Sequence, residues 1–206
     1  MEKLQDKSAI SDKSLGDFTA GIRAAMRGLW NGSLTTLDFA DAFYSTLRRG
    51  FESAWTEGAA DCGILADERT QEETKQLGLM IGDNFQYVAG LADWIYQHSK
   101  ANGGSWEAIA SRSKAWINRY EEVKGTAMAM ACKDKKLEWR IGRVKTESCR
   151  SCLKLNGRIH RSSLWASKNI HPKMIDGRLA CHGYNCGCAF VETNAPATRG
   201  RFPNLP

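Results

Sequence analysis

The forty residues CRSCLKLNGRIHRSSLWASKNIHPKMIDGRLACHGYNCGC, Cys149–Cys188, hold five of the seven cysteines in the chain. Their order is Cys149-x2-Cys152, a long spacer, and then Cys181-x4-Cys186-x-Cys188. A close pair of soft ligands, a spacer and a second cluster are typical of a chain that fixes a small fold with a metal ion. The stretch therefore predicts a cross-linked domain with little core of its own.

A tetrahedral metal site needs four ligands, and this stretch offers six, because His182 directly follows Cys181. Spacing alone does not choose among them. The preferred set is Cys149, Cys152, Cys186 and one of Cys181 or Cys188, and the expected cofactor is a structural zinc ion. The main rival is disulfide pairing of these cysteines, which would hold if the mature protein leaves the cell within a particle. A weaker rival is that they are reduced cysteines, buried as small apolar residues.

The composition around the cysteines favours a structural role over catalysis. A catalytic zinc keeps one position open and usually has a nearby carboxylate as base, whereas Asp176 is the only acid between Cys149 and Cys188. The sequence has no His-Glu-x-x-His motif, nucleophile elbow, phosphate loop or dinucleotide fingerprint. We therefore predict no enzyme and no catalytic residue. Cys62 and Cys132 are expected to pack in the core.

Bulk composition is that of a soluble globular protein. The 206 residues are 42% apolar and 25% charged. No apolar run is long enough to span a bilayer, so no membrane partner is expected. The polar N-terminus lacks the apolar core of a secretory signal, so we expect synthesis in the cytoplasm, where thiols stay reduced.

Charge is divided unevenly along the chain. Residues 1–132 carry 14 basic and 18 acidic side chains, a net −4, whereas residues 133–206 carry 15 basic and 5 acidic side chains, a net +10. Such asymmetry often marks a surface that contacts a polyanion, although a solvated basic face is an equal reading. The candidate nucleic-acid-binding residues are Arg140, Arg143, Lys145, Arg150, Lys154, Arg158 and Arg161. Trp139 and Trp165 lie among them, either to stack on bases or to cover a small sheet.

Four amphipathic helices are predicted before Lys133, because apolar residues recur at three- and four-residue steps. The expected spans are Leu15–Trp30 after a frayed segment 1–14, Thr35 or Thr36 to Gly58, Thr70 to about Lys100, and a fourth helix after Ser105. The third helix, at about thirty residues, would be near 45 Å long, which suits a bundle or a stalk. The stripe predicted to face the core from the second helix is Leu37, Ala40, Tyr44, Leu47, Phe51 and Trp55.

The chain changes character near Lys133, where β-forming residues replace helical patterns. The predicted strands are Leu137–Val144, Arg158–His160 after the hairpin signal Asn156-Gly157, and Cys188–Glu192, with a long loop at Arg161–Ala180. We therefore predict an α+β fold, a long-helix bundle or stalk followed by a small cysteine-rich domain that contains β-structure. The expected divisions are a helical region 1–132, a basic cysteine-rich domain 133–192 and an extended or disordered tail 193–206.

A resemblance to a known family rests on the cysteine-rich residues. The sequence Glu138-Trp139-Arg140, the run Cys149-x2-Cys152-x2-Leu155-Asn156-Gly157-Arg158, and Cys186-x-Cys188 together resemble the C-terminal part of the phage Mu F-like minor head protein family, also called phage head morphogenesis proteins. The common family form has His-Pro shortly before the Cys-x-Cys pair, whereas here His171-Pro172 lies far upstream and Cys181-His182 takes that place.

The resemblance implies a minor capsid protein that associates with the portal during head assembly. It implies a location in the virion, in the capsid interior or at the portal vertex, with the major capsid or scaffolding protein and sequence-independent double-stranded DNA as further candidate partners. We expect the helical stripes to supply the portal interface. The alternatives are a zinc-stapled, non-specific nucleic-acid-binding protein and a nuclease.

Overall fold

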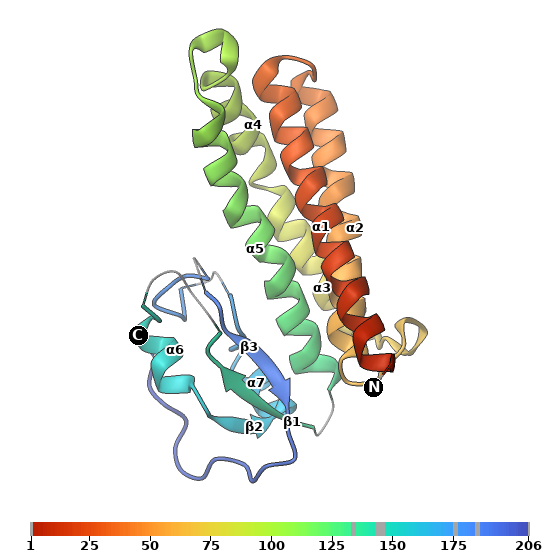
Figure 1. The fold of residues 1–206 in the computed structure, drawn as a ribbon, viewed down its shortest axis with the longest axis vertical. Coiled ribbons are helices and arrows are strands. Elements are labelled where there is room, and N and C mark those ends of the chain that lie inside the picture. The colour runs from red at the N-terminus through yellow and green to blue at the C-terminus, as the bar shows by residue number, and fades with distance from the viewer. Residues whose placement is uncertain (1, 133–134, 143–146, 175–176, 184–185, 206) are drawn as a thin grey trace. The chain divides into compact units, whose positions relative to one another are not determined.

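The computed structural model describes residues 2–132, 135–142, 147–174, 177–183 and 186–205, with side chains described from Lys13 onward. The fold is α+β, as the sequence predicts, with helices and one small antiparallel sheet (Figure 1). The longer helices are α1 Glu2–Asn31, α2 Thr36–Ala60, α3 Gln71–Phe85, α4 Val88–Gln97 and α5 Trp106–Ala131. The short 3-10 turns η1 Ala66–Glu68 and η2 Lys100–Asn102 lie in the connections before α3 and α5. Among the described residues, no helix combines the length and apolar character that crossing a membrane requires.

Helix α2 begins where the sequence predicts, and a reciprocal cap explains the position. The backbone N–H of Asp38 donates to Thr35 Oγ1 at 3.1 Å, and the backbone N–H of Thr35 donates to Asp38 Oδ2 at 3.2 Å. These bonds satisfy two of the N–H groups that a helix start leaves without partners. Hydrogen bonds from Thr35 also lower the pKa of the Asp38 carboxyl, because they favour its charged form.

The predicted stripe of α2 is partly wrong at its first turns. Leu37 is 72% exposed, whereas Phe39 and Phe43 on the neighbouring positions are fully buried. The ring of Phe43 makes an edge contact with Trp116 at 5.0 Å between centroids. Aromatic rings bury more area than Leu37 would, so they determine which face turns inward. The later stripe residues Leu47, Phe51 and Trp55 are buried as predicted.

The single long third helix is a wrong prediction, because the chain turns at Gln86–Tyr87 and forms two helices, α3 and α4. Asn84 and Gln86 explain the break. The side-chain amide of Asn84 donates to Met80 O at 2.7 Å, and that of Gln86 donates to Asp83 O at 2.9 Å. These amides compete with backbone N–H groups for the last carbonyls of α3. The 15-residue α3 is therefore about half the predicted length of 45 Å.

The first helix is longer than predicted. It begins at Glu2, so the segment 1–14, which the sequence reading left outside the helix, is helical from residue 2 onward. Residues 2–14 contain neither glycine nor proline, and several are good helix formers, so nothing in the segment terminates a helix that extends back from Leu15.

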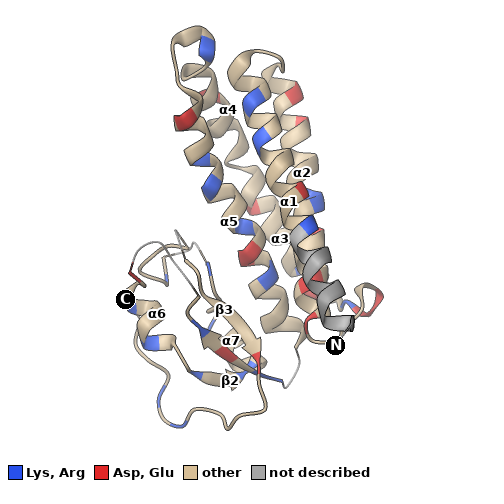
Figure 2. Cartoon of the chain, in the orientation of Figure 1, with Lys and Arg blue, Asp and Glu red and all other residues tan. Residues whose placement is uncertain are grey.

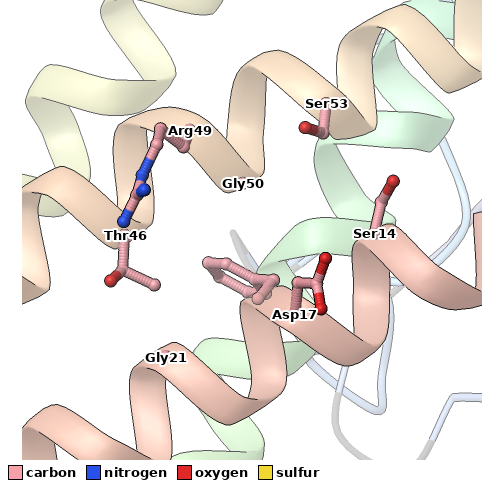
Figure 3. A pocket seen from close by; sticks show the side chains of 8 residues that line it. Ser14, Asp17, Gly21, Thr46, Arg49, Gly50 and Ser53 are labelled. Carbon is pink, nitrogen blue, oxygen red and sulfur yellow. The ribbon is translucent and has the colours of Figure 1, made fainter.

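Glycines allow close approach of α1 and α2. A Cβ at Gly21 would lie 2.8 Å from Thr46 Cγ2, and one at Gly50 would overlap the ring of Phe18. Figure 3 shows the hollow of about 400 Å³ that these helices border, with Asp17 on one side and Arg49 on the other. Both charged side chains are exposed and opposite in sign, so the hollow has no net charge with which to select an ionic ligand.

The chain divides into two compact units. The first, here called the helical unit, consists of Met1–Ala54 and Thr74–Tyr120, and the second, the cysteine unit, consists of Trp55–Glu73 and Glu121–Pro206. The ends of α2 and α5 thus belong to the cysteine unit. Sequence periodicity cannot detect this division, because each of the two helices continues across it without a change of pattern.

The sheet of the cysteine unit has strand order β2-β1-β3, with both pairs antiparallel. Its strands are β1 Lys136–Arg140, β2 Ile159–Arg161 and β3 Ala189–Glu192. Two expectations are corrected. Strand β1 ends at Arg140, before the predicted Val144, which lies outside the described residues, and the predicted loop Arg161–Ala180 begins with helix α7 Ser162–Ser167.

The turn signal Asn156-Gly157 does not form a hairpin. It joins the short helix α6 Arg150–Leu155 to β2, and Gly157 has the positive φ of 73° that favours glycine. The backbone N–H of Gly157 donates to Trp139 O at 2.9 Å, and Asn156 Oδ1 accepts from the backbone N–H of Ile141 at 3.1 Å. The turn therefore fixes α6, which carries the first cysteine pair, against the end of β1.

Large aromatic side chains form the core of the cysteine unit. Trp139 and Trp165 are fully buried, and their ring centroids lie 5.9 Å apart. Both rings also contact Phe190, and Trp165 Nε1 donates to Leu137 O at 3.1 Å. The two tryptophans therefore cover the sheet, which was one of the two predicted readings, and neither is available to stack on a base.

The sequence predicted that the C-terminal tail is either extended or disordered. In the structure it is extended and packs on the cysteine unit. The Thr198 backbone N–H donates to Ile159 O at 2.8 Å, and the Ile159 N–H donates to Thr198 Oγ1 at 2.9 Å. Phe202 packs on Trp165 and His160 at centroid distances of 5.4 and 5.5 Å. The tail thus lies along the outer edge of β2, and its Phe202 and Leu205 pack, partly buried, against the core.

Candidate metal centre

Helix α6 positions the first cysteine pair. Cys149 is the N-cap of this helix, and its Sγ accepts a hydrogen bond from the backbone N–H of Cys152 at 3.4 Å. The two-residue spacing places both sulfurs at the same end of α6. Ser151, between them, accepts a hydrogen bond at its Oγ from the Ala180 backbone N–H at 2.9 Å, which brings the second cysteine segment to the first.

All five cysteines of the stretch come together around Cys152. One group of sulfurs is Cys149, Cys152 and Cys181, the other is Cys152, Cys186 and Cys188, and within each group the sulfurs lie within 4.8 Å of one another. The Sγ atoms of Cys152 and Cys186 are 3.9 Å apart. Two thiolates bound at ~2.3 Å to one tetrahedral zinc stand about 3.8 Å apart, so this spacing fits a shared ion.

The predicted ligand His182 lies apart from both groups. Its side chain is exposed and its backbone has a positive φ of 47°. Cys152 and Cys188 are buried, whereas Cys149, Cys181 and Cys186 are half-buried. Thiolate sulfurs that are partly or fully buried are the donors that structural zinc prefers. Cys152 alone belongs to both groups. It would therefore bind a metal ion held by either group.

The thiols of the cluster differ in pKa. The pKa of Cys186 is lowered because Cys152, Cys181 and Cys188 can each hydrogen-bond to its thiolate, whereas the pKa of Cys152 is raised by hydrogen bonds to Cys181, Cys186 and Cys188 and by burial. A metal binds the thiolate form of cysteine. The hydrogen bonds within the cluster therefore favour the thiolate form at Cys186 and the protonated form at Cys152.

The two histidines near the cluster have structural roles. His171 is buried, and its Nε2 lies 3.2 Å from Thr126 Oγ1 on α5. His160 is 6% exposed, contacts Trp165 edge to face, and has no hydrogen-bond partner for Nε2 among the described residues. Neither histidine belongs to a group of described side chains that could hold a metal.

Burial of His160 predicts a pH-dependent stability. Burial, with a smaller effect of the Arg158 charge, lowers the pKa of His160 from its usual value of 6.5. The folded chain therefore keeps this ring neutral at pH values where the unfolded chain protonates it, so stability falls as the pH decreases below about 6.5. We expect the thermal midpoint to fall between about pH 7 and pH 5.5, and to fall less in His160→Gln. Calorimetry at several pH values measures this, and equal pH slopes in both proteins would contradict it.

A disulfide joins Cys62 and Cys132, which the sequence reading placed in the core as separate packing residues. Both are buried as predicted, but they are bonded to each other, with Cα atoms 5.2 Å apart and a sequence separation of 70 residues. The bond ties the end of α2 to the end of α5. The only available signal was that each cysteine follows the last turn of a helix, since sequence does not reveal that these two helix ends meet. The other five cysteines are free thiols.

Basic residues lie on α6 and on the strands of the cysteine unit, as Figure 2 shows. Arg140, Arg150, Lys154 and Arg161 are exposed, and Arg158 is half-buried. Arg140 forms an ion pair with Glu138 at 2.8 Å, and Lys154 Nζ donates to Asn204 O at 2.9 Å. The remaining predicted binding residues, Arg143 and Lys145, lie outside the described residues.

Compared with known proteins, the chain matches no family model, no curated protein and no solved structure. The convergence of five cysteines beside exposed basic residues is therefore the observation from which a function can be argued.

Proposed function

We propose that this chain is a minor capsid protein of a bacteriophage, bound to the portal during head assembly. The proposal is supported by the resemblance of its cysteine pairs to the phage Mu F-like family. It is carried by one observation, that the two cysteine pairs of that pattern, Cys149 with Cys152 and Cys186 with Cys188, meet in space. A motif whose distant halves converge around one point is stronger support than its spacing alone.

We further propose that the cysteines hold one structural zinc ion. Cys152 on α6, Cys181 in the loop after Leu179 and Cys188 beside β3 come from three separate segments. A zinc bound to four of the five thiolates would fix these segments together. Its role here is to stabilise the cysteine unit, and no chemical step is assigned to it.

The portal interface needs a different surface from the one that periodicity suggests. Half of the predicted α2 stripe, namely Leu47, Phe51 and Trp55, is buried inside the chain and cannot contact a partner. Among its described side chains, the helical unit instead exposes the large apolar residues Leu37, Leu79, Tyr87 and Tyr96, each at least 51% exposed. Exposed aromatic and aliphatic side chains are typical anchors of protein interfaces, so these residues are the proposed portal contacts.

DNA contact is proposed for the basic side of the cysteine unit. Arg150 and Arg161 are exposed on α6 and β2. Because both tryptophans of this region are buried, the contact would consist of cations on phosphates. Such binding is independent of base sequence and weakens steeply with salt.

The function is tested with portal rings encoded in the same genome as this chain. We expect the purified chain to co-sediment with these rings, and the double variant Leu79→Ser/Tyr87→Ser to lose most of the co-sedimenting protein. Leu153→Ser is the matched control, because Leu153 is 60% exposed but lies in the cysteine unit. Deletion of the gene should lower the yield of infectious heads while shells still form.

Absence of the protein from purified particles and from assembling heads alike would refute the capsid proposal. Two results would favour the alternatives. A sequence-specific footprint on duplex DNA would indicate a regulatory DNA-binding module. Magnesium-dependent DNA cleavage that is lost on substitution of His160 or His171 would indicate a nuclease.

A further inference from the structure

A hollow of about 550 Å³ lies in the cysteine unit, away from the cysteine cluster. Its walls include Ala129 on α5 and Ala166 on α7, and the hydroxyl-bearing residues Thr70, Ser162 and Ser163. Glu73 also lines it, in the first turns of α3. The volume is within the range of small-molecule sites, and the mixture of apolar walls with a few polar groups is their usual chemistry.

Glu73 is the unusual member of this set. It is only 3% exposed, and its Oε2 atom is buried with no hydrogen-bond partner among the described residues. Its backbone N–H donates to Thr70 Oγ1 at 3.3 Å, so the N-terminus of α3 is capped without help from the carboxylate. The carboxyl group therefore has no evident structural use in the chain itself.

A buried carboxylate needs a compensating charge or hydrogen bonds, because removing it from water is costly. Among the described residues, ion pairs are formed by Glu57, Asp61, Glu121, Glu138 and Glu192, among other interactions of acidic side chains, whereas Glu73 forms none. A group that is left unpaired at the wall of a hollow of ligand size is best explained by a partner that enters the hollow.

We propose that this hollow binds an alkylammonium group, such as a primary amine at the end of a short methylene chain. The Glu73 carboxylate supplies the countercharge, and the hydroxyls of Thr70 and Ser163 accept further ammonium N–H bonds. Ala129 and Ala166 give the methylene chain an apolar wall. An ammonium group is compact and has three N–H donors, so it can bind acceptors that come from separate segments. A guanidinium group is planar and is better matched to an acceptor that it can bind in a bidentate way.

The amine has two sources with the same chemistry, a free diamine or a lysine side chain of a partner protein. The experiment uses the isotope-labelled full chain and follows its methyl resonances by NMR, including that of Met130, which lines the hollow. The probes are 1,4-diaminobutane, Nα-acetyl-lysine N-methylamide and, as the neutral comparison, 1-butanol. We expect saturable shifts with both amines and none, or much weaker ones, with butanol.

Substitution Glu73→Gln should weaken amine binding by about tenfold or more, since it removes a charge-assisted hydrogen bond. Glu72→Gln is the matched control, because Glu72 borders the same hollow and is exposed. Ala166→Leu, which narrows the hollow and leaves the carboxylate intact, should also weaken binding. Higher affinity for the lysine derivative would identify a partner lysine as the source of the amine. Higher affinity for the diamine would identify a free diamine as the source.

Two outcomes would overturn the proposal. One is that neither amine gives a saturable shift in wild-type protein. The other is that Glu73→Gln, shown to be folded by its NMR spectrum, binds both amines as tightly as Glu72→Gln does. Equal affinity for butanol and for the amines would also overturn the proposal, because the hollow would then bind apolar chains without selecting for a positive charge.

Discussion

Replacement of Cys152 by serine is expected to reduce the zinc content of the protein from about one ion per chain to none. Cys152 is the one sulfur that belongs to both cysteine groups, so a zinc site built on either group includes it. Elemental analysis of protein made in the cytoplasm measures the metal directly. His182→Ala is the control and should keep the zinc, because His182 is exposed and lies outside both groups.

Loss of this zinc should also unfold most of the cysteine unit. In small zinc domains, metal binding provides on the order of 10 kcal/mol of folding free energy at neutral pH. This unit has a tryptophan core as well, so we expect a large fall in its unfolding midpoint and an increased sensitivity to chelators. Wild-type protein without metal, in which mass spectrometry finds four of the five clustered cysteines paired as two disulfides, would refute the zinc proposal.

Trp165→Ala is expected to destabilise the protein by about 3–5 kcal/mol, the usual cost of removing a buried large aromatic ring. Trp165 is fully buried and contacts His160, Phe190 and Phe202. Its removal also leaves Leu137 O without its indole donor. A loss of this size is a large part of the free energy of unfolding of a typical domain, about 5–15 kcal/mol.

Chemical denaturation followed by circular dichroism measures the effect of Trp165→Ala. Leu153→Ala is the matched control, because Leu153 is a large apolar residue that is 60% exposed, and it should change stability little. A destabilisation of Trp165→Ala no greater than that of Leu153→Ala would show that the two-tryptophan core does not stabilise this unit.

Local signals of the sequence predicted local structure well. Thr35 with Asp38 marked the start of α2, and Ser105, whose Oγ accepts from the Ala108 backbone N–H at 3.4 Å, marked the start of α5. Alternation of residues around Trp139 marked β1. For the two helix starts the decisive interactions are made within a few residues, so the sequence contains them, whereas alternation identified β1 without identifying its partners β2 and β3.

The break between α3 and α4 was missed although it is local, because the amides of Asn84 and Gln86, which bond carbonyls three and four residues back, could equally have pointed to solvent. Features that depend on distant parts of the chain were not predictable in the same way. The tail looked like a solvated segment, because the sequence does not show that Phe202 would meet Trp165. For the candidate site, the spacing identified the five cysteines, but only the folded arrangement placed Cys152 at their centre.

The Cys62–Cys132 disulfide has a consequence for how the chain responds to proteolysis. A single cut anywhere between these cysteines leaves two fragments joined by the sulfur bridge, whereas a cut outside them releases a separate piece. The bridged stretch includes the whole of Thr74–Tyr120, the second segment of the helical unit. A chain nicked in that segment would thus keep its full mass on a non-reducing gel and separate into two bands only after reduction.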